Sequence, residues 1–205
     1  MTKTMTIVYS VHDGLYINLT NRCLCACTFC IRQSADSVHG SDPLWLDHEP
    51  AVSEVIAALQ NEDMTRYKEV VFCGYGEPTE RLDALLEVAA FVKETYRLPV
   101  RINTNGLGNL IHQKDITPLL AGKIDVLSIS LNSSDPHIYE STVRPRFGEK
   151  AYPALLEFAR RAAQYVPRVV MTTVATTITR EDEERCRALC AELGVTYRIR
   201  AFVEQ

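Results

Sequence analysis

The chain has 205 residues, of which 46% are hydrophobic and 23% charged, and its net charge is −4. This composition excludes disorder, coiled coil and collagen, and it favours a single core domain over residues 1–205 with no accessory domain. The mildly acidic balance also removes the electrostatic argument for direct nucleic-acid binding.

Neither a membrane span nor an export signal is expected. No apolar run approaches the ~18–20 residues that cross a bilayer, and the amino-terminal residues lack the apolar core of a signal peptide. The chain has seven cysteines, an odd number, and four of them lie between Cys23 and Cys30. This crowding favours metal or redox chemistry in a reducing compartment over a disulfide framework. We therefore expect a cytoplasmic protein.

Extended stretches alternate with segments of helical periodicity along the whole chain. The predicted strands are residues 15–20, 69–73, 100–105, 126–132, 169–174 and 197–202. The predicted helices are residues 52–59, 82–89 and 152–159, and a fourth between Thr179, a capping residue, and Gly194, a stop. Six repeats of strand and helix predict a parallel α/β sheet with right-handed crossovers.

The strands keep one polar face. In residues 100–105, Val100 and Ile102 oppose Arg101, Asn103 and Asn105. A doubly wound sheet is covered by helices on both faces and would read as near-continuous apolar runs. A packed barrel interior would also need inward Val, Ile and Leu. The pattern instead predicts an open partial (β/α)6 TIM-type barrel, with helices outside and a polar lumen inside.

Three cysteines with the spacing C-x3-C-x2-C follow the first predicted strand. Cys23, Cys27 and Cys30 would place three thiolates on one short loop, and thiolates select zinc or iron–sulfur clusters. Structural zinc usually takes two separated pairs of ligands, and no second pair is present. Cys25 would be the fourth ligand of a zinc site, although its spacing favours an orientation away from the other three. Three cysteines around a 4Fe–4S cubane leave one iron open.

At these residues the sequence resembles the radical S-adenosylmethionine (SAM) superfamily, whose signature has an aromatic residue, here Phe29, before the third cysteine. The run 74–78 (Gly-Tyr-Gly-Glu-Pro) is similar to the family's Gly-Gly-Glu-Pro segment, whose backbone binds the methionyl amino group. Tyr75 departs from that pattern. Residues 103–106 (Asn-Thr-Asn-Gly) are similar to a turn found in many members, and residues 128–132 resemble the segment that approaches the cofactor ribose.

The resemblance implies an enzyme with two cofactors, a 4Fe–4S cluster on Cys23, Cys27 and Cys30 and SAM itself. An external one-electron reductant such as flavodoxin or ferredoxin would be its partner, and a 5′-deoxyadenosyl radical would abstract hydrogen from the substrate. The residues that the resemblance places at the cofactor are Phe29, Gly74, Tyr75, Gly76, Glu77, Pro78, Asn105, Ser130 and Asn132. It identifies no catalytic residue.

The inward arginines indicate a small anionic substrate. Arg101, Arg198 and Arg200 share the polar face and supply more cation than the single SAM carboxylate needs. Asn18 and Asn103 are further candidate substrate residues. More narrowly, the chain resembles the short radical SAM proteins encoded beside TatD-type nucleases and the queuine lyases, which free queuine from queuosine 5′-phosphate in salvage of a tRNA modification. The alternatives are a glycyl-radical-enzyme activase and a non-enzymatic zinc or iron–sulfur protein.

Overall fold

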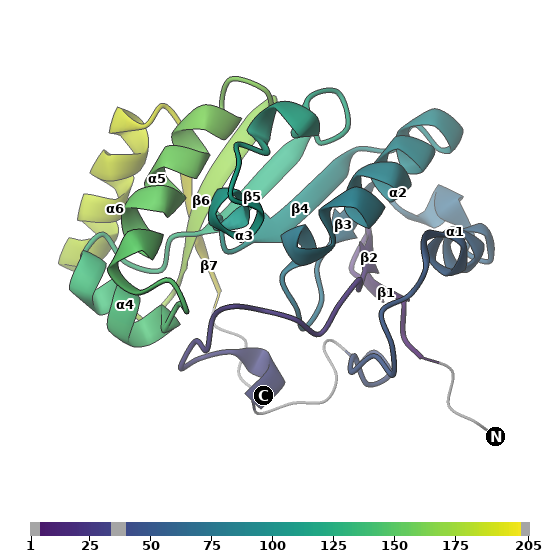
Figure 1. The fold of residues 1–205 in the computed structure, drawn as a ribbon, viewed down its shortest axis with the longest axis horizontal. Coiled ribbons are helices and arrows are strands. Elements are labelled where there is room, and N and C mark those ends of the chain that lie inside the picture. Colours follow the sequence, from purple (N-terminus) through teal and green to yellow (C-terminus); the bar gives the residue numbers. More distant parts are fainter. Residues whose placement is uncertain (1–4, 34–39, 202–205) are drawn as a thin grey trace.

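The computed structural model describes residues 5–33 and 40–201, and its strands form a seven-stranded sheet in the order β1 to β7. β1 (Val8–Val11) pairs antiparallel with β2 at one edge. The other strands run parallel to one another: β2 (Gly14–Ile17), β3 (Glu69–Phe72), β4 (Val100–Thr104), β5 (Val126–Ser130), β6 (Arg168–Val174) and β7 (Thr196–Arg200). The predicted partial barrel of parallel strands with helices outside is confirmed (Figure 1).

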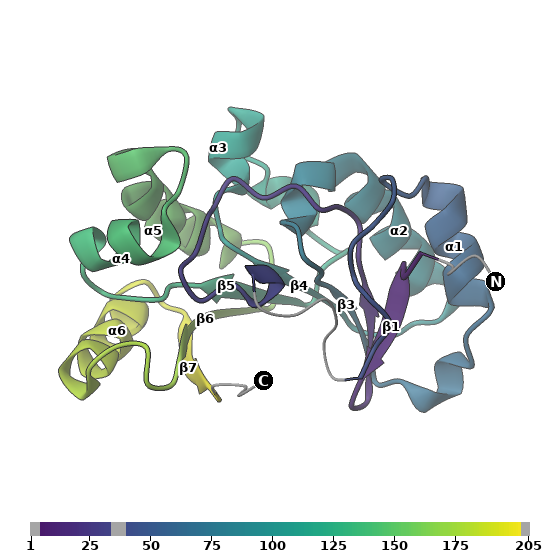
Figure 2. The same cartoon turned by 90° about the horizontal axis from the view of Figure 1, so that it is seen from below.

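The α-helices lie in the connections between parallel strands and gather along one side of the curved sheet (Figures 1 and 2). They are α1 (Val52–Gln60), α2 (Leu82–Thr95), α3 (Gly108–His112), α4 (Pro136–Val143), α5 (Ala151–Ala162) and α6 (Arg180–Glu192). Short 3-10 turns are η1 (Ile31–Gln33), η2 (Met64–Arg66), η3 (Pro78–Arg81), η4 (Thr117–Leu120) and η5 (Gly148–Lys150). Among the described residues, no helix combines the length and apolarity of a membrane span.

The strand alternation predicted from the sequence decides which side chains face the helices. Ile102 of β4 and Leu127 of β5 are fully buried in the main core, together with Leu155 and Phe158 of α5. Burying a side chain of this size stabilises the fold by roughly 1.5–3 kcal/mol. The neighbouring position Arg101 points to the opposite, concave face, where it bonds to Tyr16 of β2. Hydrophobic burial therefore holds the helices to one face and leaves the concave face for polar side chains.

The structure differs from the sequence predictions mainly at strand ends and in short elements. Strand β1, α3 and α4 were not predicted, because elements of four to eight residues show too little periodicity. The fourth predicted strand ends at Ser130 because Asn132 has a left-handed backbone, with φ of 65°. Phe202, at the end of the last predicted strand, lies outside the described residues. Cys186 and Cys190 are buried in the core, as their helical spacing predicts.

Candidate metal and cofactor site

The cysteine-bearing loop leaves β2 and crosses the carboxyl edge of the sheet toward α4, as Figure 2 shows for the purple segment after β2. Its far side is tied to the end of α4 by backbone hydrogen bonds. The Ala26 N–H donates to the Val143 carbonyl at 3.1 Å, and the Thr28 N–H donates to the Thr142 carbonyl at 2.9 Å. Because the carboxyl edge of a parallel barrel is where its active sites form, the loop lies where cofactor chemistry is expected.

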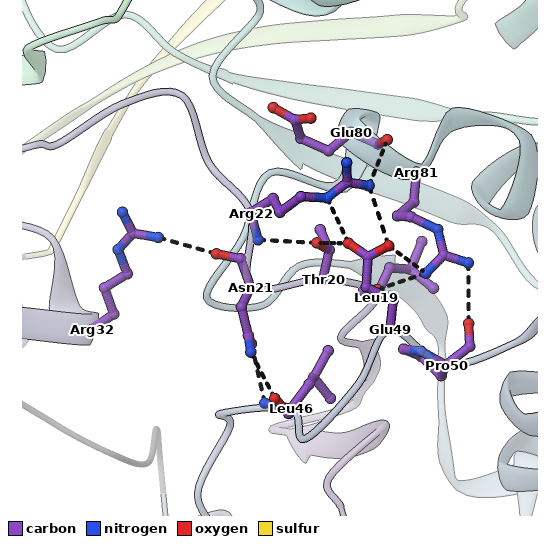
Figure 3. Close-up of polar contacts among 10 residues, drawn as sticks. All are labelled: Leu19, Thr20, Asn21, Arg22, Arg32, Leu46, Glu49, Pro50, Glu80 and Arg81. Carbon is purple, nitrogen blue, oxygen red and sulfur yellow. Dashed lines mark hydrogen bonds and ion pairs between the residues drawn. The ribbon is translucent and has the colours of Figure 1, made fainter.

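The segment before the cysteines is held by Glu49, whose carboxylate collects hydrogen bonds from Thr20 and Arg22, both at 2.6 Å (Figure 3). Arg81 forms an ion pair with the same carboxylate at 3.4 Å and also donates to the Leu19 carbonyl. Desolvation raises the pKa of Glu49, but the hydrogen bonds from Thr20 and Arg22 outweigh it, so the pKa lies below its ordinary value. Glu49 thus joins the start of the loop to the η3 turn.

Arg32, in the η1 turn just after the third cysteine, closes the loop from its other end. Its guanidinium donates to the carbonyls of Asn21 at 3.3 Å, Cys25 at 3.3 Å and Tyr75 at 3.4 Å (Figure 3 shows the Asn21 bond). A guanidinium has five N–H donors in a fixed plane, which lets one side chain gather several carbonyls. Arg32 therefore links both ends of the loop to the turn after β3.

The three signature thiols and the fourth cysteine of the loop have different surroundings. Cys23, Cys27 and Cys30 are half-buried free thiols, whereas Cys25 is 5% exposed and packs in the main core. A hydrogen bond from Cys25 lowers the pKa of Cys23, and the same bond raises the pKa of Cys25, which keeps Cys25 a neutral thiol. Burial, followed by repulsion from Cys30 and Cys23, raises the pKa of Cys27 to about 12.

The donor set fits a multi-iron cluster better than a single metal ion. Cys23, Cys27 and Cys30 supply three thiols, which suits a 4Fe–4S cluster with one open iron, whereas a structural zinc site takes four ligands. The amide of Asn105 donates toward the Cys25 sulfur at 3.6 Å and the Cys23 sulfur at 4.0 Å. The Tyr139 hydroxyl lies near Cys25 and is a buried donor with no partner among the described residues. Thiolate and sulfide acceptors would satisfy such donors.

The turn after β3 is organised by the buried carboxylate of Glu77. One oxygen of Glu77 accepts from the Thr79 N–H at 3.1 Å and from the Thr104 hydroxyl at 2.7 Å, and the other accepts from the Asn105 N–H at 2.7 Å. Burial raises the pKa of Glu77, and these bonds oppose the shift. A backbone N–H donates to each of the two oxygens, from Thr79 to one and from Asn105 to the other. Glu77 positions Asn105 and has no oxygen free of protein donors.

Replacing Glu77 with glutamine is expected to destabilise the fold by about 1–3 kcal/mol, because the amide NH2 must face a backbone N–H that then has no acceptor. Urea unfolding of the purified protein measures the change. Glu87→Gln makes the same chemical change on the exposed face of α2 and should stay within about 0.5 kcal/mol of the parent. Equal stability of the Glu77→Gln variant and the parent protein would show that the buried carboxylate is not required.

Tyr75, the departure from the family pattern, has its own packing site. Its ring stacks edge-on against Trp45 at 5.0 Å between centroids and joins a small core with Tyr9, Val11 and Leu44. The side chain is therefore fixed by packing within this small core. Phe29 and Ser130 are half-buried, and Pro78 begins the η3 turn and is buried.

The two asparagines at the ends of β2 and β5 carry unpartnered oxygens. Asn18 is fully buried and donates to the Leu44 carbonyl at 2.6 Å, while its Oδ1 atom lacks a partner among the described residues. Asn132 is 5% exposed, and its Oδ1 atom also lacks a hydrogen-bond partner among the described residues. Buried oxygens without donors mark places where a bound ligand or water is expected.

Arg101 faces the lumen as predicted, but its guanidinium is not free for a substrate. It forms an ion pair with Glu69 through contacts of 2.6 and 3.1 Å and also donates to Asn103 at 2.9 Å and Tyr16 at 3.2 Å. Glu69 of the neighbouring strand thus supplies an anion for Arg101 from within the protein, so Arg101 adds no unpaired charge to the three arginines predicted to face a substrate. Arg198 and Arg200 are exposed on β7 and have no ion pair among the described residues.

Glu49, Arg32 and Asn21 are site residues that the sequence reasoning missed. Asn21 bonds Leu46 in both directions, donating to its carbonyl at 2.8 Å and accepting from its N–H at 3.1 Å (Figure 3). Arg32 follows the third cysteine closely, and Glu49 stands far from the motif along the chain. Only the position of Arg32 next to the motif could have signalled its role.

The model of the radical SAM superfamily matches residues 17–190, which include the three cysteines and strands β3 to β6. No curated protein matches the chain.

Solved structures with the same fold share little sequence with the chain. SuiB of Streptococcus suis, bound to its precursor peptide SuiA, aligns with a TM-score of 0.73 and 18% identity, covering 96% of this chain and 41% of SuiB. A radical SAM methyltransferase from Sphaerobacter thermophilus aligns with a TM-score of 0.65 and 18% identity, covering 95% of this chain and 57% of the enzyme. Methylornithine synthase aligns with a TM-score of 0.61 and 15% identity, covering 94% of this chain and 54% of the synthase. This chain thus spans about half the length of these structures.

Proposed function

This chain belongs to the radical SAM superfamily, and from that membership we propose that it is an enzyme acting on a small anionic substrate. Membership implies a 4Fe–4S cluster and SAM, which together supply a 5′-deoxyadenosyl radical that abstracts hydrogen. The observation that carries the proposal is the placement of Cys23, Cys27 and Cys30 on one loop over the carboxyl edge of a sheet with a polar concave face. An external flavodoxin or ferredoxin would provide the electron.

The residues of the chain would have separate tasks in this reaction. Cys23, Cys27 and Cys30 would hold the cluster, and the Asn105 amide would remain beside the Cys23 sulfur. Glu77 would keep Asn105 in place through its N–H. A radical that abstracts hydrogen must be kept from water and held against one substrate atom, and the lumen under the loop is the place for that.

For the specific reaction we propose release of queuine from queuosine 5′-phosphate. The support is the resemblance of the sequence to short radical SAM proteins of this kind, together with exposed arginines on β7 that have no ion pair among the described residues. A guanidinium binds a phosphate in a bidentate manner, so Arg198 and Arg200 suit a phosphorylated nucleoside. The reaction would use a small molecule and not intact nucleic acid.

The test is an anaerobic assay of the reconstituted protein with queuosine 5′-phosphate and with the unphosphorylated nucleoside, following queuine and 5′-deoxyadenosine together. We expect queuine from the phosphate alone, at least tenfold faster than from the nucleoside. Hydrogen bonds to charged groups contribute about 1.5–3 kcal/mol, which supports a ratio of this size. Equal rates would remove the phosphate argument, and release from neither would reject the queuine reaction.

A further inference from the structure

A polar cavity of about 200 Å³ opens on the concave face of the sheet, near the amino ends of the strands. Arg168 of β6 and Arg198 of β7 line it, together with Ser128 of β5 and the ion pair between Glu69 and Arg101. None of these residues belongs to the cysteine loop or to the turn after β3. The cavity is thus a second feature of the concave face, separate from the cluster site.

The cavity holds two positive charges that the protein does not neutralise. Glu69 is the acidic residue of the lining, and its carboxylate is engaged by Arg101 in a bidentate ion pair. The side chain of Arg101 is only 14% exposed, which holds this pair in place. Arg168 and Arg198 have no acidic partner in the part of the chain that the structure describes. The cavity is therefore prepared for a ligand with two negative charges.

A phosphomonoester meets this requirement, since it carries about −1.5 to −2 charges near pH 7 and accepts bidentate bonds from guanidinium groups. A carboxylate would neutralise only one of the two arginines. We propose that this cavity binds the phosphomonoester of the substrate, through Arg168 and Arg198 with the Ser128 hydroxyl as a further donor. The inference rests on the proposed function for its substrate. It assigns the phosphate to Arg168 and Arg198 in place of the pair Arg198 and Arg200, because Arg200 does not line the cavity, and it leaves Arg101 paired with Glu69.

The position of the cavity also restricts the shape of the substrate. Ser128 lies two residues before Ser130, where β5 ends at the carboxyl edge of the sheet, so the two levels are ~7 Å apart at ~3.3 Å per residue. An inorganic phosphate could occupy the cavity but could not reach that edge. The substrate class that fits is an elongated phosphomonoester, with its phosphate toward the amino ends of the strands and its reacting part toward the cysteine loop.

The experiment is calorimetric titration of the reconstituted protein with ribose 5-phosphate and with ribose, under anaerobic conditions and without reductant. We expect the phosphorylated sugar to bind at least tenfold more tightly than ribose. Arg168→Gln and Arg198→Gln should each weaken binding of ribose 5-phosphate at least tenfold. Arg160→Gln removes the same charge from the outer face of α5, where Arg160 pairs with Glu157, and should change the affinity less than twofold.

Equal affinity for the two sugars, no measurable binding of ribose 5-phosphate, or equal weakening in the Arg160→Gln variant would overturn the proposal. Circular dichroism of each variant establishes that it is folded, and Arg198→Lys, which keeps the charge but not the bidentate geometry, should bind between the parent and Arg198→Gln. Because no reductant is present, binding is separated from turnover. SAM cleavage is measured separately, with a reductant added. If the protein binds ribose 5-phosphate but does not cleave SAM, the proposed function is contradicted and the phosphate site is not.

Discussion

Replacing Cys23, Cys27 or Cys30 with alanine is expected to remove the iron–sulfur cluster and to bring reductive SAM cleavage below detection. Each thiolate holds one iron, so a loop with only two of the three thiolates leaves a second iron of the cluster without a protein ligand. The fourth cysteine of the loop should behave differently. Cys25 is buried in the main core and kept neutral by its hydrogen bond to Cys23, so Cys25→Ala should retain iron and SAM cleavage.

The measurements are iron and sulfide per chain after anaerobic reconstitution, and 5′-deoxyadenosine formed with a chemical reductant. Cys186→Ala is the matched control for Cys25→Ala, because Cys186 is fully buried in α6, far along the chain from the cysteine loop. Both variants should lose some stability and keep the cluster. Loss of iron in Cys25→Ala to the level of the other three would favour a four-cysteine site, and tightly bound zinc in place of iron would favour the non-enzymatic alternative.

The fold and the cluster loop could be predicted because their signals are local. The C-x3-C-x2-C spacing lies within eight residues, and the alternation in β4 and β5 is set by the two-residue period of a strand. Hydrophobic burial on the helix side then fixes the inward phase of Arg101. The antiparallel strand β1 was not predicted, because four residues at a sheet edge show almost no hydrophobic periodicity.

The polar contacts of the site could not be predicted, because their partners are far apart along the chain. The phase of β4 correctly indicates that Arg101 points inward, yet its partner Glu69 comes from β3, 32 residues earlier. Glu49 reaches Thr20 across 29 residues of the sequence. Only the folded register brings such pairs together. Sequence therefore shows where polar groups face, and the structure shows which of them are already paired and which await a ligand.

Replacing Gly76 is expected to disrupt the cysteine loop itself. A Cβ atom at this position would lie 2.2 Å from the Thr20 carbonyl oxygen and 2.6 Å from the Arg22 carbonyl oxygen. The resemblance to the Gly-Gly-Glu-Pro segment implies that a side chain here would obstruct the methionyl group of SAM and leave iron binding intact. The structure indicates instead that the cysteine loop is disturbed before SAM binds, because the clash is with the backbone that leads into Cys23. Gly76→Ala should therefore reduce stability by the ~1–3 kcal/mol typical of overpacking or more, and should also reduce iron content.

The neighbouring glycine provides the decisive comparison, because its obstacle is a side chain. A Cβ atom at Gly74 would lie 2.0 Å from Oδ1 of Asn18, so shortening Asn18 should relieve the clash. We expect Gly74→Ala to lose stability and the double variant Gly74→Ala/Asn18→Ala to recover part of it relative to the sum of the single changes. No single side-chain change can relieve Gly76→Ala, since backbone carbonyls are the obstacle.

Gly108→Ala meets only the flexible end of Ile116 at its closest contact and should be the mildest change. Urea unfolding and iron analysis of these variants measure the effects, and full iron content in a stable Gly76→Ala protein would show that this turn is free to move away from the cysteine loop.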